Sequence, residues 1–314
     1  MTTISETTIR VRYAETDTMG VVYYGHYLTY FEVGRVEVVP RPGVSLDMIG
    51  GAEQAKTAIS GLSYALRMPD LYQRWGITPP HGGLLYGPPG NGKTLLAKAL
   101  ATVSEALFYH LRLRTLTSRV GPNAAEVIKE VFQLAASEGK GIIFFDDADA
   151  LSLEHVLPPD RAREAAAPLV SGLCELLDGL AAYPTLIVLA ATSRPDGIDS
   201  PLIAPGRLDH LIEVPLPEGP ALREIIEIRR ARAEKLAERT LFEPLDYEML
   251  VPRLAGMSGG EVAEILRRAL EAKVQLAGSG TEPGRVTTAD VLRAVDDFRH
   301  VREVAAKIRY GQYL

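Results

Sequence analysis

A glycine-rich run between a strand pattern and a helix pattern constrains this chain most. Residues 87–94 read Gly-Pro-Pro-Gly-Asn-Gly-Lys-Thr, after the apolar stretch 83–86 and before the helix-forming stretch 95–100. In that context the spacing G-x-x-x-x-G-K-T turns backbone N–H groups toward the phosphates of a nucleotide. It also places Lys93 on the β- and γ-phosphates and offers Mg²⁺ the hydroxyl of Thr94. We therefore predict a nucleotide site rather than a glycine-rich turn with a chance lysine.

Composition and charge exclude several classes of protein. With 314 residues, 46% of them apolar and 24% charged, the chain can bury more than one core. Its net charge of −6 argues against broad nucleic-acid or anionic-membrane binding. One cysteine, Cys174, excludes an internal disulfide and a thiolate metal cluster. The start is not signal-like and no apolar run reaches about 18 residues, so we expect a cytoplasmic protein without a membrane span.

A second apolar strand ends in carboxylates. Residues 141–145 read Gly-Ile-Ile-Phe-Phe, and Asp146, Asp147 and Asp149 follow directly. A buried strand of this kind delivers its last side chains to the sheet edge where open α/β folds bind ligands. We expect Asp146 to hold Mg²⁺, directly or through water, and Asp147 to orient or deprotonate the attacking water. The alternative is a solvated acidic turn after a core strand.

Further motifs lie at separated places in the chain, two of them on either side of a third apolar strand at 185–191. They are Asp47-Met48-Ile49-Gly50-Gly51, Leu176-Leu177-Asp178-Gly179, Thr192-Ser193-Arg194 and Gly256-Met257-Ser258-Gly259-Gly260-Glu261. In this order, and with the two nucleotide motifs, they resemble the AAA family of ring-forming ATPases over roughly residues 43–300. The resemblance implies a P-loop core with a parallel sheet, a C-terminal helical lid, and adenine flanked by the first and last of these motifs.

The resemblance also implies roles for single residues. Lys93, Asp147, Ser193 and Arg207 are implied as catalytic, with Arg207 reaching the γ-phosphate of a neighbouring subunit. Thr94 and Asp146 are implied as Mg²⁺ ligands. The residues implied to bind ATP are Gly50, Pro88, Gly90, Asn91, Gly92, Lys93, Thr94, Leu95 and Gly259.

Three positions depart from the family pattern. The family usually has glutamate at position 147, asparagine at 193 and a second arginine finger at 204, where this chain has Asp147, Ser193 and Ala204. An ångström of misplacement at the base can cost on the order of 10²-fold, and loss of an arginine finger on the order of 10³-fold. We therefore expect binding to survive better than hydrolysis.

Two functions follow from these departures. The favoured one is a slow ATPase that remodels or disassembles protein substrates. The other is an ATP-binding scaffold or regulatory subunit with weak or no hydrolysis. Arg207 would act across a subunit interface, so the expected assembly is a homo-hexamer or a hetero-oligomer with a catalytically complete AAA subunit.

The residues expected in the central pore are basic. Unfolding members of the family usually carry an aromatic residue before a Val-Gly pair, and here Arg119 precedes Val120 and Gly121. An aromatic residue grips any polypeptide, whereas a ring of arginines would prefer acidic or phosphorylated segments. With Arg112 and Arg114 nearby, an acidic protein substrate is a hypothesis. A solvated loop position for Arg119 is the alternative.

The first forty residues resemble a different family. Strand-like alternation, an Asp-x-x-Gly loop at Asp17 and helical spacing beyond it resemble the opening of hotdog-fold acyl-CoA thioesterases, whose catalytic aspartate matches Asp17. The further strands of that fold do not follow, so we expect a vestigial segment and keep thioesterase activity as a remote alternative. The segment is a fusion relic, a gene-prediction artefact or an appended strand and helix. The predicted domains are a hotdog-like fragment (1–40), the ATP-binding core (41–218) and the helical lid (219–314).

Overall fold

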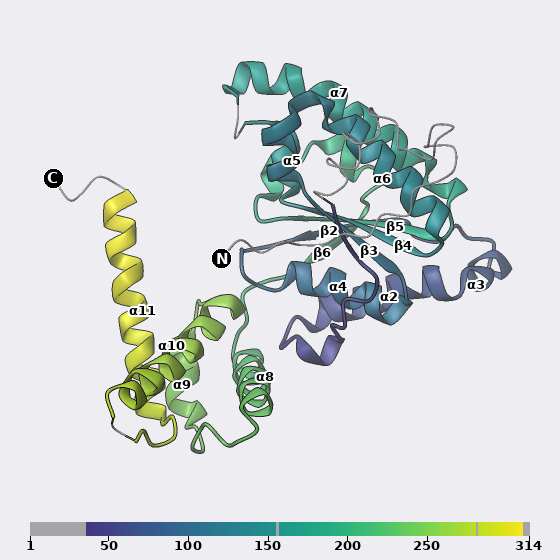
Figure 1. The fold of residues 1–314 in the computed structure, drawn as a ribbon. Coiled ribbons are helices and arrows are strands. Elements are labelled where there is room, and N and C mark those ends of the chain that lie inside the picture. The colour runs from purple at the N-terminus through teal and green to yellow at the C-terminus, as the bar shows by residue number, and fades with distance from the viewer. Residues whose placement is uncertain (1–35, 155–156, 281, 310–314) are drawn as a thin grey trace, which may run out of the picture. The chain divides into compact units, whose positions relative to one another are not determined.

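The computed structural model describes residues 36–154, 157–280 and 282–309 (Figure 1). The described chain forms two compact units. The sheet unit comprises residues 36–44, Thr57–Tyr86 and Ala97–Ile212, and the loop-and-lid unit comprises Ser45–Lys56, Gly87–Leu96 and residues 213–309. Asp17 lies outside the described residues, as does the hotdog-like segment up to residue 35.

The sheet unit is built on one six-stranded sheet of order β1-β3-β4-β5-β2-β6. The strands are β1 (Glu37–Val39), β2 (Gly82–Tyr86), β3 (Leu107–Arg112), β4 (Gly141–Asp146), β5 (Leu186–Thr192) and β6 (His210–Glu213). β3, β4, β5 and β2 run parallel, and β1 is antiparallel to β3. The predicted α/β core with a parallel sheet is confirmed.

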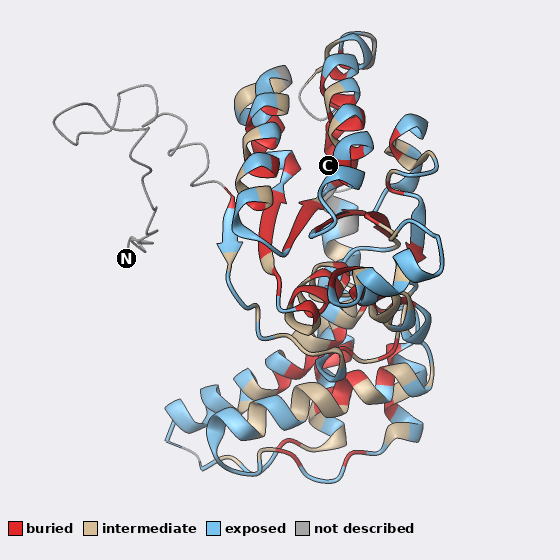
Figure 2. Ribbon diagram, turned by 90° about the vertical axis from the view of Figure 1, so that its right-hand side faces the viewer, coloured by how far each residue is buried: buried red, intermediate tan, exposed pale blue. Residues whose placement is uncertain are grey.

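The parallel strands deliver their last residues to one edge of the sheet. Tyr86 of β2 pairs with Thr192 of β5, and Asp146 of β4 pairs with Arg112 of β3. Every residue of β5 and all but the last of β4 are buried, as strands covered on both faces should be (Figure 2). The phosphate loop begins at Gly87, directly after β2, so the chain enters it from this edge.

Helices cover both faces of the sheet. α5 (Leu113–Val120), α6 (Ala124–Glu138) and α7 (Pro159–Asp178) lie on one face, and α2 (Glu53–Arg67) and α4 (Lys93–Ser104) lie on the other (Figure 1). α3 (Pro69–Arg74) follows α2. Short 3-10 helices fill the connections: η2 (Leu46–Met48), η3 (Gly121–Asn123), η4 (Ala148–Ser152), η5 (Gly179–Ala182), η6 (Pro195–Gly197) and η7 (Ser200–Ile203).

One helix of the sheet unit has an apolar composition that needs an explanation. The segment Arg161–Ala182, most of which is α7, is long and apolar enough to cross a membrane by length and composition alone. In the structure α7 buries Leu169, Leu173 and Leu177 in the core beneath the sheet. Core packing therefore accounts for its apolar face.

Four helices after residue 219 form a separate core in the loop-and-lid unit. They are α8 (Pro220–Ala237), α9 (Tyr247–Leu254), α10 (Gly259–Gly278) and α11 (Thr288–Arg309). Their core includes Leu250, Val262, Ile265, Leu266 and Val295. The predicted helical lid is confirmed, and the apolar stripe of α10 packs inward. Helix α9 was not predicted, because at eight residues it offers little periodicity to read.

Candidate functional site

The phosphate loop has a backbone that only glycine adopts easily. Gly87, Gly90 and Gly92 have φ values of 140°, 80° and 87°. A Cβ atom on Gly90 would lie 2.8 Å from the hydroxyl oxygen of Ser258. Both the positive φ and this close approach explain why glycine stands there.

Lys93 is folded back onto the loop that precedes it. It is the first residue of α4, its side chain is 8% exposed, and its Nζ donates to the carbonyl oxygens of Gly87 and Pro88 at 2.7 and 2.9 Å. These two contacts hold the ammonium group over the loop. Thr94 and Leu95 follow in the first turn of α4, where backbone N–H groups and the helix dipole favour an anion.

The start of α10 lies against the phosphate loop. Gly260 N donates to Gly90 O at 2.8 Å, and Gly259 N donates to Asn91 Oδ1 at 3.4 Å. Ser258 begins the helix with a capping box, since it accepts from Glu261 N while Glu261 accepts from Ser258 N. Three of the predicted ATP-binding residues, Gly90, Asn91 and Gly259, are thereby brought together.

A hollow of about 430 Å³ opens in the same unit. Gly50, Asn91, Ile225 and Gly259 are among the residues that line it. A Cβ atom on Gly50 would lie 2.6 Å from the Ile225 side chain, so only glycine fits there. Gly50 and Gly259, the residues predicted to flank adenine, therefore line the same hollow as Asn91 of the phosphate loop.

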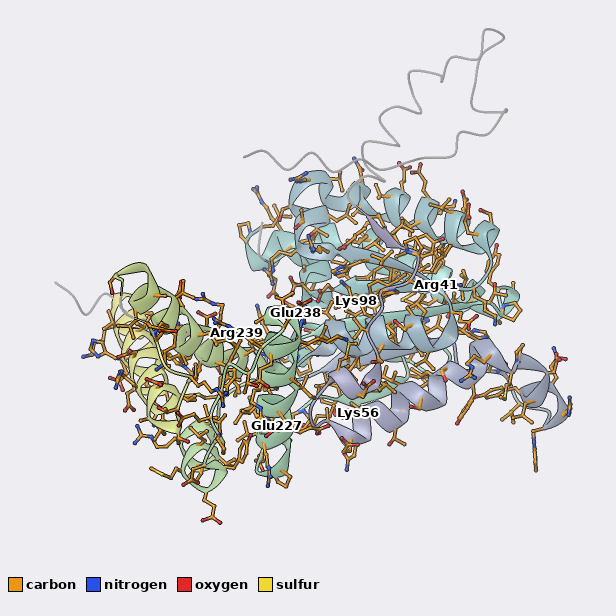
Figure 3. All side chains as sticks on the ribbon, turned by 60° about the horizontal axis from the view of Figure 1, so that its bottom comes forward. Arg41, Lys56, Lys98, Glu227, Glu238 and Arg239 are labelled. Atoms are coloured by element: carbon orange, nitrogen blue, oxygen red, sulfur yellow. The ribbon has the colours of Figure 1, made fainter. Side chains whose placement is uncertain are left out.

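A short polar chain fixes the segment that carries Gly50. Gly51 N donates to Glu224 Oε2 at 2.7 Å, and Lys56 Nζ lies 2.9 Å from Glu53 and 3.5 Å from Glu224. Lys56 is labelled in Figure 3. These contacts tie the segment to α8, which supplies Glu224.

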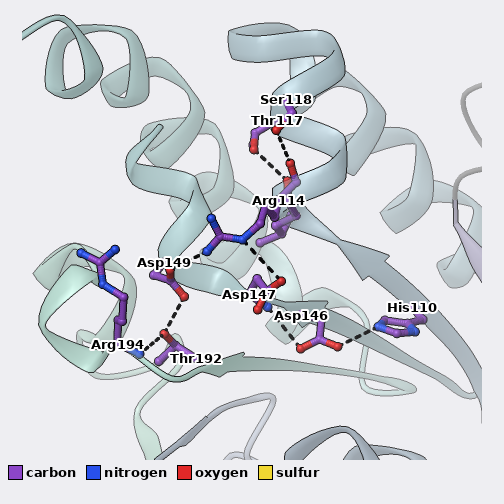
Figure 4. A network of polar contacts seen from close by, with 10 residues as sticks. His110, Arg114, Thr117, Ser118, Asp146, Asp147, Asp149, Thr192 and Arg194 are labelled. Carbon is purple, nitrogen blue, oxygen red and sulfur yellow. Dashed lines mark hydrogen bonds and ion pairs between the residues drawn. The ribbon is translucent and has the colours of Figure 1, made fainter. Parts of the chain in front are cut away.

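In the sheet unit, the carboxyl end of β4 carries a polar network (Figure 4). Asp146 Oδ2 lies 3.1 Å from Nε2 of His110 on β3, and Asp146 Oδ1 accepts from Asp147 N at 3.2 Å. Asp146 is only partly exposed. His110 was not predicted as a site residue, although a histidine inside an apolar strand is a signal that could have been followed.

Asp147 sits in a strained backbone position beside a guanidinium. Its φ is +56°, in the left-handed region that aspartate tolerates better than longer residues. Arg114 Nε lies 3.7 Å from Asp147 Oδ2, and Arg114 Nη2 donates to Asp149 Oδ2 at 3.2 Å. The sequence grouped Arg114 with the pore residues, whereas the structure places it in this carboxylate cluster.

Asp149 joins the end of β4 to the end of β5. It is 7% exposed, and its Oδ1 accepts from Thr192 Oγ1 at 2.9 Å. Thr192 Oγ1 in turn accepts from Arg194 N at 2.9 Å, so the turn that carries Ser193 is fixed from both sides. Ser193 itself is exposed. No role was predicted for Asp149 or Thr192.

The two predicted Mg²⁺ ligands both offer oxygen atoms, one from each unit. Across the described residues, no three His, Cys, Asp or Glu side chains gather as a metal cluster. Mg²⁺ usually takes one or two protein oxygens plus phosphate oxygens and water. The carboxylate of Asp146 and the hydroxyl of Thr94 are protein oxygen ligands of this kind.

Comparison with protein families decides what this arrangement is. The family described as "ATPase family associated with various cellular activities (AAA)" matches residues 83–216. Residues 83–216 therefore form an AAA domain. The resemblance predicted from the sequence motifs is therefore confirmed, whereas nothing supports the hotdog-like fragment.

Several curated proteins are similar to this AAA chain. Proteasome-activating nucleotidase of Methanothermobacter thermautotrophicus is 36% identical over 270 residues, which are 85% of this chain and 63% of the relative. The protein of the same name from Saccharolobus solfataricus is 33% identical over 268 residues, 84% of this chain and 65% of the relative. The AAA chain thus spans less than two thirds of the length of these relatives.

Arg207, the predicted arginine finger, hydrogen-bonds to groups of its own chain. Arg207 donates from Nε and Nη2 to Asp178 at 2.7 and 2.8 Å, and from Nη1 to Pro201 O at 2.6 Å. The hydrogen bond from Arg207 holds the pKa of Asp178 below its ordinary value. Arg207, Arg194 and the buried Cys174 line a hollow of about 730 Å³. Ala204 lies just after η7.

The predicted pore residues of the AAA domain end a helix. Arg119 and Val120 are the last residues of α5, and Gly121 follows with a φ of +57°. Arg119 is exposed, and Arg112 is 65% exposed with its Nη2 at 3.6 Å from Glu37. All three guanidinium groups are exposed, and Arg114 differs in that it also pairs with Asp147 and Asp149.

Proposed function

We propose that this chain binds ATP with Mg²⁺, hydrolyses it slowly as a subunit of a ring, and uses the hydrolysis to remodel protein substrates. The single observation that carries the proposal is the phosphate loop, with Lys93 donating to two loop carbonyl groups. A bound nucleotide would receive that ammonium group in exchange for the carbonyl oxygens. The match to the AAA family supports the same assignment.

The ATP site uses residues that differ in what they supply. Pro88, Gly90, Asn91 and Gly92 shape the loop, and Gly90, Asn91, Gly92 and Leu95 offer backbone N–H groups to the phosphates. Gly50 and Gly259 leave room for adenine in the hollow of about 430 Å³. Lys93 supplies positive charge to the phosphates.

Magnesium belongs to the same proposal. Thr94 and Asp146 are the residues that would hold it, through a hydroxyl and a carboxylate oxygen. When bound, Mg²⁺ neutralises the charge that builds on the phosphates.

Hydrolysis depends on three further side chains. Asp147 accepts the proton of the attacking water or orients that water, and Ser193 helps to place it. Arg207 acts on the γ-phosphate bound by a neighbouring subunit, so the active form is a ring, with six subunits as the proposed number. The short carboxylate of Asp147 and the alanine at 204 make the rate slow.

Protein substrates are proposed because the relatives are named as activators of proteasomes. Arg119 and Val120 form the proposed pore contact, and the exposed guanidinium of Arg119 favours acidic segments. The relatives' role and the composition support a cytoplasmic location.

A second candidate, an ATP-binding scaffold without turnover, is favoured by one observation. Asp147 lies beside Arg114, and Arg207 is engaged by Asp178, so both groups needed for turnover have partners within the chain. If nothing releases them, ATP binding would set assembly state only.

The rate of ATP hydrolysis as a function of protein concentration separates the two candidates, with Lys93→Ala as the blank. A rate that rises more steeply than linearly and vanishes in the variant supports an active ring. Tight ATP binding without turnover would refute the ATPase and leave the scaffold.

A further inference from the structure

His110 is buried on β3, next to the edge strand β1, and lies close to two carboxylates. The side chain is 4% exposed. Nε2 lies 3.1 Å from Asp146 Oδ2, and Nδ1 lies 3.4 Å from Glu37 Oε2. An ionised carboxylate only accepts hydrogen bonds, so each contact requires an N–H on the ring nitrogen that faces it, and the two contacts together require the imidazolium form.

The ring of His110 has little freedom to turn. Its centroid lies 5.3 Å from that of Phe144 and 5.9 Å from that of Phe108. The strand pairing places His110 beside Phe144, two residues before Asp146, on the same face of the sheet. Packing therefore aims Nε2 along the strand toward the carboxylate, which limits the rotation of Asp146.

The other ring nitrogen faces a residue from the edge of the sheet. Glu37 lies directly opposite His110 in the antiparallel β1–β3 pairing. Glu37 also lies 3.6 Å from Arg112 Nη2, which holds its carboxylate in place. β1 precedes the part of the chain that the family matches, residues 83–216. An element outside that part thus touches the ring that orients Asp146.

We propose that His110 is a positioning residue for Asp146, and that strand β1 orients His110 through Glu37. The inference rests on the proposed function, in which Asp146 holds Mg²⁺. A histidine that fixes the orientation of a metal-binding carboxylate strengthens metal binding without touching the metal. Strand β1 then influences how much Mg²⁺ raises the affinity for nucleotide. The affinity in the absence of Mg²⁺ depends on the phosphate loop instead.

Equilibrium binding of a fluorescent ADP analogue to the full chain, in EDTA and at increasing Mg²⁺ concentration, tests the proposal. His110→Phe keeps an aromatic ring and removes the donor. His110→Gln removes the ring, but its amide nitrogen reaches about as far as Nε2 and restores the donor. Tyr109→Phe is the matched control, because it removes a buried hydroxyl from the next residue of β3, on the opposite face.

We expect His110→Phe to lower the Mg²⁺-dependent gain in affinity by about tenfold. That is the lower end of the range of about 10- to 100-fold that is typical when a residue supporting a metal ligand is lost. Affinity in EDTA should stay unchanged. His110→Gln should recover most of the gain, and Tyr109→Phe should match the wild type. Glu37→Ala, on the exposed edge strand, should reduce the gain in the same direction without disturbing the core.

Two results overturn the proposal, and they differ. A gain that is equal in wild type, His110→Phe and Glu37→Ala would refute the positioning role while leaving the ATP site intact. Wild-type protein that binds no nucleotide with or without Mg²⁺ would refute the proposed function and, with it, this inference. Thermal unfolding of each variant shows that a lost gain does not come from lost structure.

Discussion

Replacing Asp147 by glutamate is predicted to raise the rate of ATP hydrolysis. The change moves the carboxylate outward by one C–C bond, about 1.5 Å. A reacting group that is misplaced by about an ångström costs on the order of 10²-fold in rate. If the short side chain limits turnover, Asp147→Glu should therefore raise kcat by about 10- to 100-fold at saturating ATP.

The structure also predicts a cost in stability for the same change. Asp147 has a φ of +56°, and aspartate is enriched in that region because its short side chain bonds locally. Glutamate there should lose about 1 kcal/mol of folding stability. In a chain of 314 residues that lowers the melting temperature by about 1–2 °C. Faster turnover together with lower stability would show that the short side chain of Asp147 limits the rate while it suits the backbone at that position.

The assay is steady-state phosphate release at a fixed protein concentration, with Asp147→Asn as the control. Asparagine keeps the local backbone preference and cannot accept a proton, so it should remove the activity. The reasoning is refuted if glutamate is no faster than aspartate, or if Asp147→Asn keeps the wild-type rate. Either result would mean that Asp147 is not the group that handles the water.

Three further predictions concern other parts of the chain. Arg119→Glu should weaken binding of an acidic unfolded protein, measured by fluorescence anisotropy, and leave ATP hydrolysis without substrate unchanged; unaltered binding would remove the pore contact. Asp149→Asn should lower the free energy of unfolding, measured in urea, by about 1–2 kcal/mol, because the buried carboxylate loses a charge-assisted hydrogen bond. The control Asp297→Asn, at an exposed position, should leave the free energy of unfolding unchanged. Hydrogen bonds from Arg267 and Arg268 lower the pKa of Glu264 from 4.5 to about 2. The stabilising effect of the ionised Glu264 is therefore present above pH 4.5 and is lost as the pH falls toward 2. Glu264→Gln should flatten the plot of melting temperature against pH in that range.

The elements that position the ATP site follow from local sequence. The strand at 83–86 and the loop and helix after it are predictable, because the glycine spacing and the apolar runs are local signals that the fold obeys. The same holds for β4, whose apolar run ends where its carboxylates begin. The lid helices were readable from their three- and four-residue spacing.

Contacts across the sheet could not be read from the sequence. The His110–Asp146 contact depends on the register of β3 against β4, and the His110–Glu37 contact on an antiparallel edge strand; the partners are 36 and 73 residues apart. The pairing of Arg207 with Asp178 depends on how the segment after β5 packs against the end of α7. Such pairings are set by tertiary packing, which no local pattern contains.

The contacts of the predicted pore arginines could not be read from the sequence for the same reason. Arg112, Arg114 and Arg119 form a basic cluster in sequence. On α5, however, Arg114 turns toward Asp147 and Asp149, because residues five apart on a helix lie on different faces. Only the structure shows which of these guanidinium groups pairs with the carboxylates that follow β4.

Calorimetric titration of the full chain with a non-hydrolysable ATP analogue and Mg²⁺ tests the central claim most directly. We predict one site per chain, and an affinity that Lys93→Ala lowers by about 10- to 100-fold, since a hydrogen bond to a charged group contributes about 1.5–3 kcal/mol. No binding by the wild type, or equal affinity in Lys93→Ala, would contradict the assignment of the loop at residues 87–94 as the nucleotide site.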